Sequence, residues 1–247
     1  MRGLAVTVAG AIGGALLAVA IVLTLADQGM MPINEGQMQS WLMRHPDLAL
    51  AMIGRQQQLD DARKQAQQAS AMKKVGQQSF FDSRIAFVTG PADAKNSVVE
   101  FYDYDCPYCR ASQPEVQKFY ETHKADTRFS FIELPLDIHG PNAVLAARAS
   151  IAARNQPDKY VAFHFAMMSN KDPVDAAAIF DIAQKAGLDL EKLRADMNRP
   201  EIEDIIKKSH ALATKVGIDG TPTFIVNGQM HPGMVQDGEL EQLAKSS

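Results

Sequence analysis

The stretch "FYDYDCPYCR", residues Phe101–Arg110, holds both cysteines of this 247-residue chain. Only Pro107 and Tyr108 separate Cys106 from Cys109. A disulfide across so short a loop removes little conformational entropy from the unfolded chain, so it would be a poor structural bridge. The pair is therefore expected to carry out chemistry.

The residues around the cysteines predict a βαβ unit. Before them, Ser97–Tyr102 is mostly apolar and rich in β-formers, as expected of a central strand buried on both faces. After them, Ser112–Lys124 is predicted as a helix and Arg128–Leu134 as the next strand. This order indicates two parallel strands joined by a helical crossover. Upstream, the apolar residues of Phe80–Val88 suggest another short strand.

A C-x-x-C motif between a buried strand and a helix is typical of a thioredoxin-like redox protein. Cys106 would lie at the helix N-terminus, where unpaired N–H groups and the helix dipole stabilise a thiolate. Cys109, one turn later and shielded, would resolve the mixed disulfide. The alternatives are a structural bridge and half of a zinc site. A zinc site needs two more ligands, and the sequence has no second C-x-x-C and no H-x-x-H.

The rest of the chain divides into a long helical stretch and a closing hairpin. Residues 142–216 are predicted as helices, one of them capped at Asp172-Pro173. Thr221-Pro222 then precedes the strand Thr223–Val226, and Asn227-Gly228 is a strong hairpin signal. The remaining predicted elements are the returning strand 229–231 and a final helix over 237–245.

The N-terminus differs from the rest of the chain. Arg2 precedes the uncharged apolar stretch Gly3–Ala26, and Thr24-Leu25-Ala26 offers a small-x-small cleavage site. As a helix the stretch would be about 36 Å long, enough to span a bilayer. It is either a cleaved secretory signal or an uncleaved anchor, and both place the rest of the chain outside the cytoplasm. The expected location is periplasmic or extracytoplasmic, with anchoring by residues 3–26 if the segment is kept.

Residues Glu35–Lys74 are predicted as two helices divided by Pro46. The second helix carries a heptad pattern in which Arg55 is the one polar member. The pattern comprises Leu48, Met52, Arg55, Leu59, Ala62, Ala66 and Ala69. The other faces are polar, so this helix would be marginal alone. It is either a polar linker helix or an oligomerisation arm whose apolar stripe is covered by other copies. We favour the arm, with Trp41 and Leu42 at the interface.

Charge and the remaining polar residues exclude some functions and leave others open. The formal net charge is −4 and basic residues are interleaved with acidic ones, so nothing indicates nucleic-acid binding. His139 either edges the active-site face or is a loop histidine without a role, and His164 is expected to be a packing residue. The rival function is a copper- or metal-handling periplasmic protein that uses the two thiols as ligands.

These motifs together resemble the DsbA family of exported bacterial thiol–disulfide oxidoreductases. The resemblance covers about Ser97 to the C-terminus and rests on C-P-Y-C, on the helical insertion, and on Glu100, Pro114 and Thr221-Pro222. It implies that Glu100 is a buried acid that exchanges a proton with Cys109. It also implies that Pro222 is cis and faces the cysteines, and that the substrate-binding residues are Pro107, Tyr108, Thr221 and Pro222.

The chain departs from the strongly oxidising members of that family. Tyr108 replaces their histidine, and Asp103 and Asp105 add negative charge that opposes the Cys106 thiolate, whereas Arg110 favours it. A weaker oxidant is expected. The N-terminal arm resembles the stalk of the subgroup related to ScsC, the suppressor-of-copper-sensitivity protein, whose members carry C-P-Y-C and form oligomers.

The predicted fold class is α/β: a thioredoxin-like fold with an inserted all-helical domain, preceded by a helical arm. The predicted divisions are the signal or anchor 1–26, the arm 27–76, the two thioredoxin parts 77–141 and 217–247, and the insertion 142–216. The predicted activity needs no cofactor beyond the Cys106–Cys109 disulfide. The expected partners are substrate proteins with thiols or disulfides, a DsbB-like or DsbD-like membrane redox protein, and other copies bound through residues 35–74.

Overall fold

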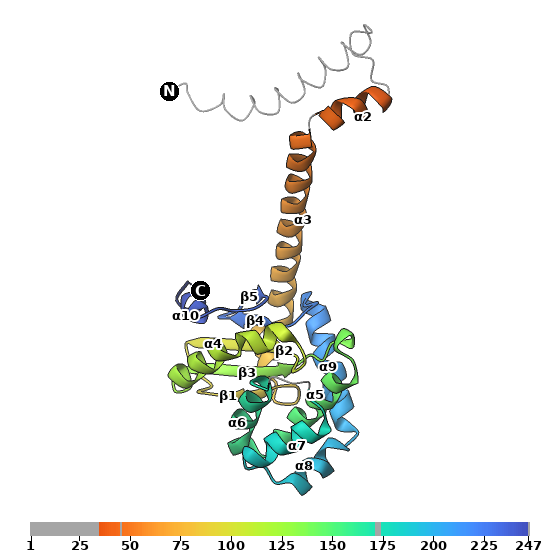
Figure 1. Cartoon of the computed structure of the whole chain (residues 1–247). Coiled ribbons are helices and arrows are strands. Elements are labelled where there is room, and N and C mark those ends of the chain that lie inside the picture. Colours follow the sequence, from red (N-terminus) through yellow and green to blue (C-terminus); the bar gives the residue numbers. More distant parts are fainter. Residues whose placement is uncertain (1–34, 45, 171–173, 247) are drawn as a thin grey trace, which may run out of the picture. The chain divides into compact units, whose positions relative to one another are not determined.

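The computed structural model describes residues 35–44, 46–170 and 174–246 (Figure 1). The predicted signal or anchor segment and the cap at Asp172-Pro173 lie outside these residues. Within the described ranges, no helix is long and apolar enough to cross a membrane. The chain divides into two compact units, residues 1–63 and 64–247.

The helices and strands follow the predicted order. Helix α2 spans Glu35–Arg44, and helix α3 spans Pro46–Val75, so α3 begins in the first unit and ends in the second. The second unit then contains η1 (Gln77–Phe81), β1 (Phe87–Thr89), β2 (Asn96–Tyr102), α4 (Pro107–His123), β3 (Thr127–Glu133), η2 (Asp137–His139), α5 (Pro141–Ala153), α6 (Pro157–Met168), α7 (Ala176–Lys185), α8 (Leu190–Met197), α9 (Glu201–Val216), β4 (Thr223–Val226), β5 (Gln229–Pro232) and α10 (Glu239–Ser246).

The strands form one sheet in the order β1-β3-β2-β4-β5. Strands β2 and β3 are parallel and joined through α4, which confirms the predicted βαβ unit, and all other neighbours are antiparallel. The predicted strand over Phe80–Val88 is partly wrong, because only Phe87–Thr89 is extended. Phe80 lies in the 3₁₀ helix η1, from which its ring meets that of Phe101 edge-on at 6.1 Å. This contact with the central strand is a tertiary one that the local sequence does not show.

The sheet separates two hydrophobic clusters, because successive side chains of a strand point to opposite faces. On β2, Val98 and Tyr102 belong to the cluster that also includes Cys109 and residues of α4 and the insertion. Val99 and Phe101 belong to the second cluster, with residues of η1 and α9. The same alternation places the side chain of Glu100 on the face of Cys109.

Helix α4 begins at Pro107, five residues before the predicted start at Ser112. Proline is favoured in the first turn of a helix because its fixed φ suits the helix and its missing N–H would be unpaired there. Pro114 lies inside the same helix. The buried carboxylate of Glu115 accepts the backbone N–H groups of Gly238 (2.9 Å) and Leu240 (3.0 Å), which fastens the start of α10 to α4.

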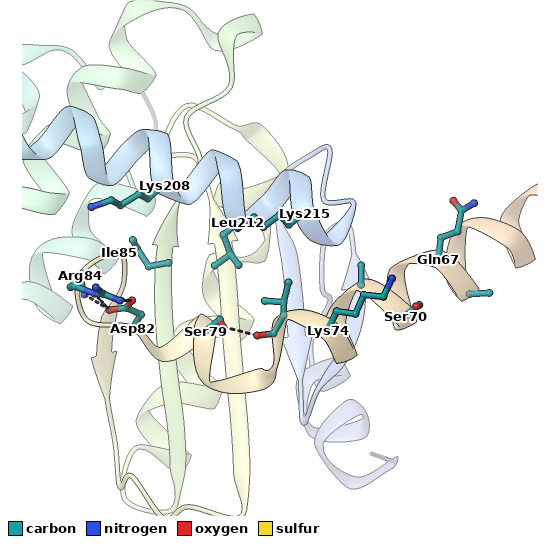
Figure 2. A pocket seen from close by; sticks show the side chains of 13 residues that line it. Gln67, Ser70, Lys74, Ser79, Asp82, Arg84, Ile85, Lys208, Leu212 and Lys215 are labelled. Carbon is teal, nitrogen blue, oxygen red and sulfur yellow. Dashed lines mark hydrogen bonds and ion pairs between the residues drawn. The ribbon is translucent and has the colours of Figure 1, made fainter.

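The last part of α3 belongs to the second unit and contacts the residues that follow α9. Gln68 donates to the carbonyl of Gly217 (2.8 Å), and Lys64 pairs with Asp219 (2.9 Å). Between α3, η1 and α9 lies a groove of about 980 Å³, shown in Figure 2. Lys74, Lys208 and Lys215 stand on its rim and the buried Leu212 lies on its floor. None of the predicted site residues lines this groove.

Candidate active site

Cys106 is the N-cap residue of α4, as predicted from the sequence. Its φ and ψ of −73° and 119° are extended, and its carbonyl accepts the N–H of Arg110 (3.2 Å), the first bond of the helix. The sulfur therefore lies at the end of the helix where unpaired backbone N–H groups point outward. Both cysteines are free thiols and are buried.

The surroundings of Cys106 stabilise its thiolate. A hydrogen bond from Cys109 is the largest contribution, and hydrogen bonds from the backbone of Cys109 and Tyr108 add to it. Burial opposes them, but together they lower the pKa of Cys106 from 9.0 to about 5. At neutral pH the reduced protein thus carries a thiolate at Cys106, which is the form that attacks disulfides.

Cys109 has the opposite character. Burial raises its pKa well above 9.0, and the hydrogen bond and charge of Cys106 add to the rise. The backbone of Asp103 acts the other way and lowers the pKa of Cys109. In the reduced protein Cys109 is therefore a protonated thiol, and it must lose that proton before it can attack a mixed disulfide.

Glu100 is a buried carboxyl on the same face of the sheet. Its side chain comes from the middle of β2, and its residue is 3% exposed. Within the described part of the chain its Oε2 atom has no hydrogen-bond partner. Burial raises the pKa of Glu100 from 4.5 to about 8, so the group holds or releases a proton close to neutral pH. Its charge is one of the influences that raise the pKa of Cys109.

The loop before β4 completes the site. The Thr221-Pro222 peptide bond is cis. When Cys106 is protonated, its thiol donates a hydrogen bond to the Thr221 carbonyl at 3.2 Å, so two segments 115 residues apart meet at the sulfur. The Pro222 carbonyl accepts the N–H of Gly233 (2.9 Å), which ties the loop to the end of the hairpin.

Exposed apolar groups lie close to the reactive sulfur. Tyr108 is 63% exposed, and Met234, which follows Gly233, is 39% exposed. The Val235 N–H donates to Ser112 Oγ (3.1 Å), and Ser112 Oγ donates to the Tyr108 carbonyl (3.0 Å), so Met234 is next to a residue that contacts the start of α4. A groove of about 520 Å³ lies between the first turns of α4 and the end of α6. It is lined by Pro107, Arg110, Ala111, Gln113, Pro114, Met168, Ser169 and Asn170.

The two aspartates of the motif are not the isolated negative charges that the sequence suggested. Asp103 lies 2.6 Å from Nδ1 of His139, and Asp105 lies 2.8 Å from Nη2 of Arg110. Each aspartate therefore has a basic partner that offsets part of the negative charge expected to oppose the thiolate. His139 is a residue of the site whose role the sequence leaves open. It lies 36 residues from Asp103 in the chain, so its position in the sequence does not indicate that the two side chains meet.

A second buried carboxyl, Glu133, lies on the neighbouring strand β3. Its Oε1 accepts the hydroxyl hydrogen of Tyr102 (2.8 Å), and its other oxygen forms an ion pair with Arg154. Tyr104 joins this buried network through Ser150 (2.8 Å) and Nδ1 of His164 (2.9 Å). Burial lowers the pKa of His164 to about 3, so it is neutral, in line with the packing role expected for it.

The described residues contain no group of three or more His, Cys, Asp or Glu side chains that would hold a metal ion. The two thiols are therefore the soft ligands that the described part of the chain brings together. The arrangement provides an acidic thiol at Cys106, a buried thiol of high pKa at Cys109, and a buried acid, Glu100, whose pKa lies between those of the two thiols.

Comparison with known proteins agrees with this chemistry. Residues 97–245 match the family model of the DSBA-like thioredoxin domain. Among solved structures, a thioredoxin-like oxidoreductase from Silicibacter pomeroyi DSS-3 is 38% identical, with a TM-score of 0.62 over 69% of this chain and 96% of that one. ScsC of Proteus mirabilis in a transitional conformation is 25% identical, with a TM-score of 0.61 over 85% and 91%.

The curated relatives differ in length. Disulfide bond formation protein D of Bacillus subtilis is 28% identical over 63% of this chain and 73% of its own. A Na(+)/H(+) antiporter NhaA 3 of Salinispora tropica is 33% identical over 59% of this chain, but the match spans only 22% of that much longer protein. Because the family model covers more than half of the chain, the protein belongs to the family of DSBA-like thioredoxin domains.

Proposed function

We propose that this protein is exported and catalyses thiol–disulfide exchange in other proteins through Cys106 and Cys109. The observation that carries the proposal is the contrast between the two thiols. The pKa of Cys106 is lowered to about 5, whereas burial raises that of Cys109 well above its ordinary value. The Cys106 sulfur is thus suited to attack a disulfide and to leave as a thiolate, and the Cys109 sulfur is suited to resolve the mixed disulfide.

In the oxidising direction, a substrate thiolate attacks Cys106 Sγ of the disulfide form. The Cys106–Cys109 bond breaks, and Cys109 leaves and takes up a proton, for which Glu100 is the donor. A second substrate thiolate then attacks the mixed disulfide and releases the Cys106 thiolate. Two substrate thiols become one disulfide while the enzyme disulfide becomes a dithiol, so two electrons move and no further oxidant is needed within the cycle. Reduction is the same sequence reversed.

Exchange assays with single-cysteine variants test this proposal. Cys106→Ala is expected to abolish exchange with a scrambled or reduced model protein, because the nucleophile is lost. Cys109→Ala should instead accumulate mixed disulfides, since nothing resolves them. Full activity in Cys106→Ala would overturn the proposal. Stoichiometric Cu(I) binding by a wild type that performs no exchange would favour the metal-handling alternative.

The pKa of the Cys106 thiolate bears on how strongly the pair oxidises its substrates. A pKa of about 5 for Cys106 lies above the value of about 3.5 that the strongly oxidising DsbA reaches. A less stabilised thiolate makes the reduced form less favourable, so we infer a weaker oxidant, suited to reduction or isomerisation as well as oxidation. Equilibration with glutathione buffers measures this directly. The redox state of the pair in intact cells then separates a DsbB-like partner, which keeps it oxidised, from a DsbD-like partner, which keeps it reduced.

The substrate surface would combine the thiolate with its apolar surroundings. Pro107, Tyr108, Thr221 and Pro222 border Cys106, and the exposed ring of Tyr108 offers contact area to apolar segments of an unfolded protein. Folded proteins bury such segments, so exchange should favour unfolded substrates. Tyr108→Ser is expected to raise KM for an unfolded protein and to leave the reaction with a small disulfide unchanged.

The first unit would assemble copies of the chain. The described helices of residues 35–63 expose six large apolar side chains, at 40–79% of their areas: Met43, Leu48, Leu50, Met52, Ile53 and Leu59. Leu48, Met52 and Leu59 belong to the predicted heptad stripe. Such a stripe is expected to be covered by its counterparts in a coiled coil. The match to ScsC covers 85% of the chain, which supports the same assignment.

Charge reversal on the stripe tests assembly in the full-length chain. Leu48→Lys with Leu59→Lys should yield monomers by light scattering, with exchange retained and isomerisation reduced. Gln57→Lys, on the opposite face of α3, is the matched control and should leave the assembly intact. A monomeric wild type would contradict the arm. Export and retention of the segment 3–26 are tested by fractionation and by the N-terminal sequence of the mature protein.

A further inference from the structure

We propose that His139 is a positioning residue for both cysteines, acting through Asp103. The proposal rests on the function proposed above and adds a residue to its site. The backbone of Asp103 contacts the nucleophile directly, because its carbonyl accepts the N–H of Cys106 (3.1 Å). The same backbone is one of the influences on the pKa of Cys109, which it lowers. The orientation of this one residue therefore affects the nucleophile and its partner together.

The carboxylate of Asp103 fixes that orientation. Its side chain is 0% exposed and accepts three hydrogen bonds: Oδ2 from the Leu136 N–H (2.8 Å) and from His139 Nδ1 (2.6 Å), and Oδ1 from the Asp105 N–H (3.0 Å). Two of the donors are uncharged backbone groups. His139 is the side-chain donor, and it is the one of the three that can also carry a balancing positive charge.

The imidazole is itself held in place. His139 closes the 3₁₀ helix η2, with its N–H donated to the Leu136 carbonyl (3.0 Å), and its side chain is 15% exposed. An ionised carboxylate only accepts hydrogen bonds, so Nδ1 must carry the hydrogen. The pair thus joins the turn before Cys106 to the loop that leads from β3 into the helical insertion.

Loss of His139 would leave a buried negative charge near the thiolate without its basic partner. Like charge disfavours a thiolate, so the Cys106 pKa should rise and the equilibrium should shift from dithiol towards disulfide. We expect His139→Ala to raise the thiolate pKa by about one unit, a tenfold change in the thiolate equilibrium. His139→Asn, which retains a side-chain N–H near the position of Nδ1 without a charge, should recover about half of that shift.

The experiment is a pH titration of the thiolate by ultraviolet absorbance, together with equilibration against glutathione, in the full-length protein. His123→Ala is the matched control: this histidine also faces carboxylates, Asp126 at 3.3 Å and Glu241, but lies at the far end of α4. It should titrate like the wild type. A control that shifts as much as His139→Ala would mean a general effect of charge and would overturn the proposal.

A double-mutant cycle shows whether His139 acts through Asp103. In an Asp103→Asn background there is no negative charge to balance, so His139→Ala should change the thiolate equilibrium less than twofold. A wild-type titration in His139→Ala, or a shift of the same size in the Asp103→Asn background, would refute the role. Neither readout uses a protein substrate. A wild type with an acidic Cys106 and no exchange activity would count against the proposed function and leave this inference standing.

Discussion

Glu100 and Glu133 are two buried carboxyls on neighbouring parallel strands that face the same side of the sheet, yet their surroundings are opposite. Glu133 accepts the Tyr102 hydroxyl hydrogen and pairs with Arg154. Glu100 has no partner for Oε2 among the described residues, and burial raises its pKa to about 8. The two residues are 1% and 3% exposed, so burial alone does not distinguish them.

The difference shows that the hydrogen-bond and ion-pair partners of a buried carboxyl, more than its exposed fraction, decide whether it is charged. A buried carboxylate paired with a guanidinium and a hydroxyl is stable as an anion, and it holds the protein together. A buried carboxyl without a partner is stable as a neutral acid and changes charge near neutral pH, which is the property that a proton carrier needs. We therefore expect Glu133 to stabilise the fold and Glu100 to take part in the chemistry.

The largest effect is expected from Glu133→Gln. The substitution leaves the buried Arg154 guanidinium without its counter-ion, which costs about 3–5 kcal/mol of unfolding free energy. Urea unfolding measures this, and exchange activity per folded molecule should be retained. Glu203→Gln, which removes an exposed ion pair with Lys207, is the control and should lose about 0–1 kcal/mol. An equal loss in both variants would contradict the assignment of Glu133.

Glu100→Gln should stabilise the protein in alkaline solution. In the folded protein the pKa of Glu100 is about 8, above its ordinary 4.5. The unfolded chain therefore releases this proton at lower pH than the folded protein does, and wild-type stability falls between about pH 4.5 and pH 8. The variant should be more stable than the wild type by about 2–4 kcal/mol above pH 8, and the difference should vanish below pH 4.5. A pH-independent difference would mean that Glu100 is not buried as a neutral acid.

The same variant should be slow in resolution. Glutamine accepts no proton from Cys109, so the step in which Cys109 attacks the mixed disulfide is expected to slow by about tenfold to hundredfold at neutral pH. Rapid mixing with a single substrate turnover isolates this step. Glu133→Gln is the matched variant, and its rate per folded molecule should be unchanged. Equal slowing in both would remove the distinction between the two acids.

Tyr102→Phe is expected to have the smallest effect. It deletes one hydroxyl that donates to Glu133 at 2.8 Å and leaves the ion pair with Arg154 in place. The loss should be about 1–2 kcal/mol of unfolding free energy. No loss at all in thermal or urea unfolding would show that Arg154 and the Tyr160 hydroxyl satisfy Glu133 without Tyr102.

Local sequence signals were sufficient for much of the fold. The apolar run Ser97–Tyr102, the cysteines, the following helix and strand, and the Asn-Gly turn after Val226 each carry their own pattern, and the structure confirms these elements. Phe80 was misassigned because its position depends on a contact with Phe101 rather than on its neighbours in the chain. Helix α4 begins at Pro107 rather than at Ser112, because proline suits the first turn of a helix.

The candidate site likewise contains residues that the sequence indicates and contacts that only the folded chain shows. Cys106, Cys109, Glu100 and Thr221-Pro222 follow from motifs and from resemblance, and the structure brings Thr221 to Cys106 and buries Glu100. The pairing of Asp103 with His139 is not visible in the sequence, because it joins the end of β2 to a loop beyond β3. Partners of this kind are set by the strand order, so only the assembled sheet identifies them.

The helical insertion between β3 and β4, in which the described residues include helices α5 to α9, has a consequence for the order of synthesis. Cys106 emerges from the ribosome 115 residues before Thr221, whose carbonyl accepts its hydrogen bond. Strand β4, which pairs with the central strand β2, arrives with Thr221. Pairing of such distant segments is slow in folding. A growing chain therefore carries both thiols for some time before Thr221 and strand β4 complete their surroundings.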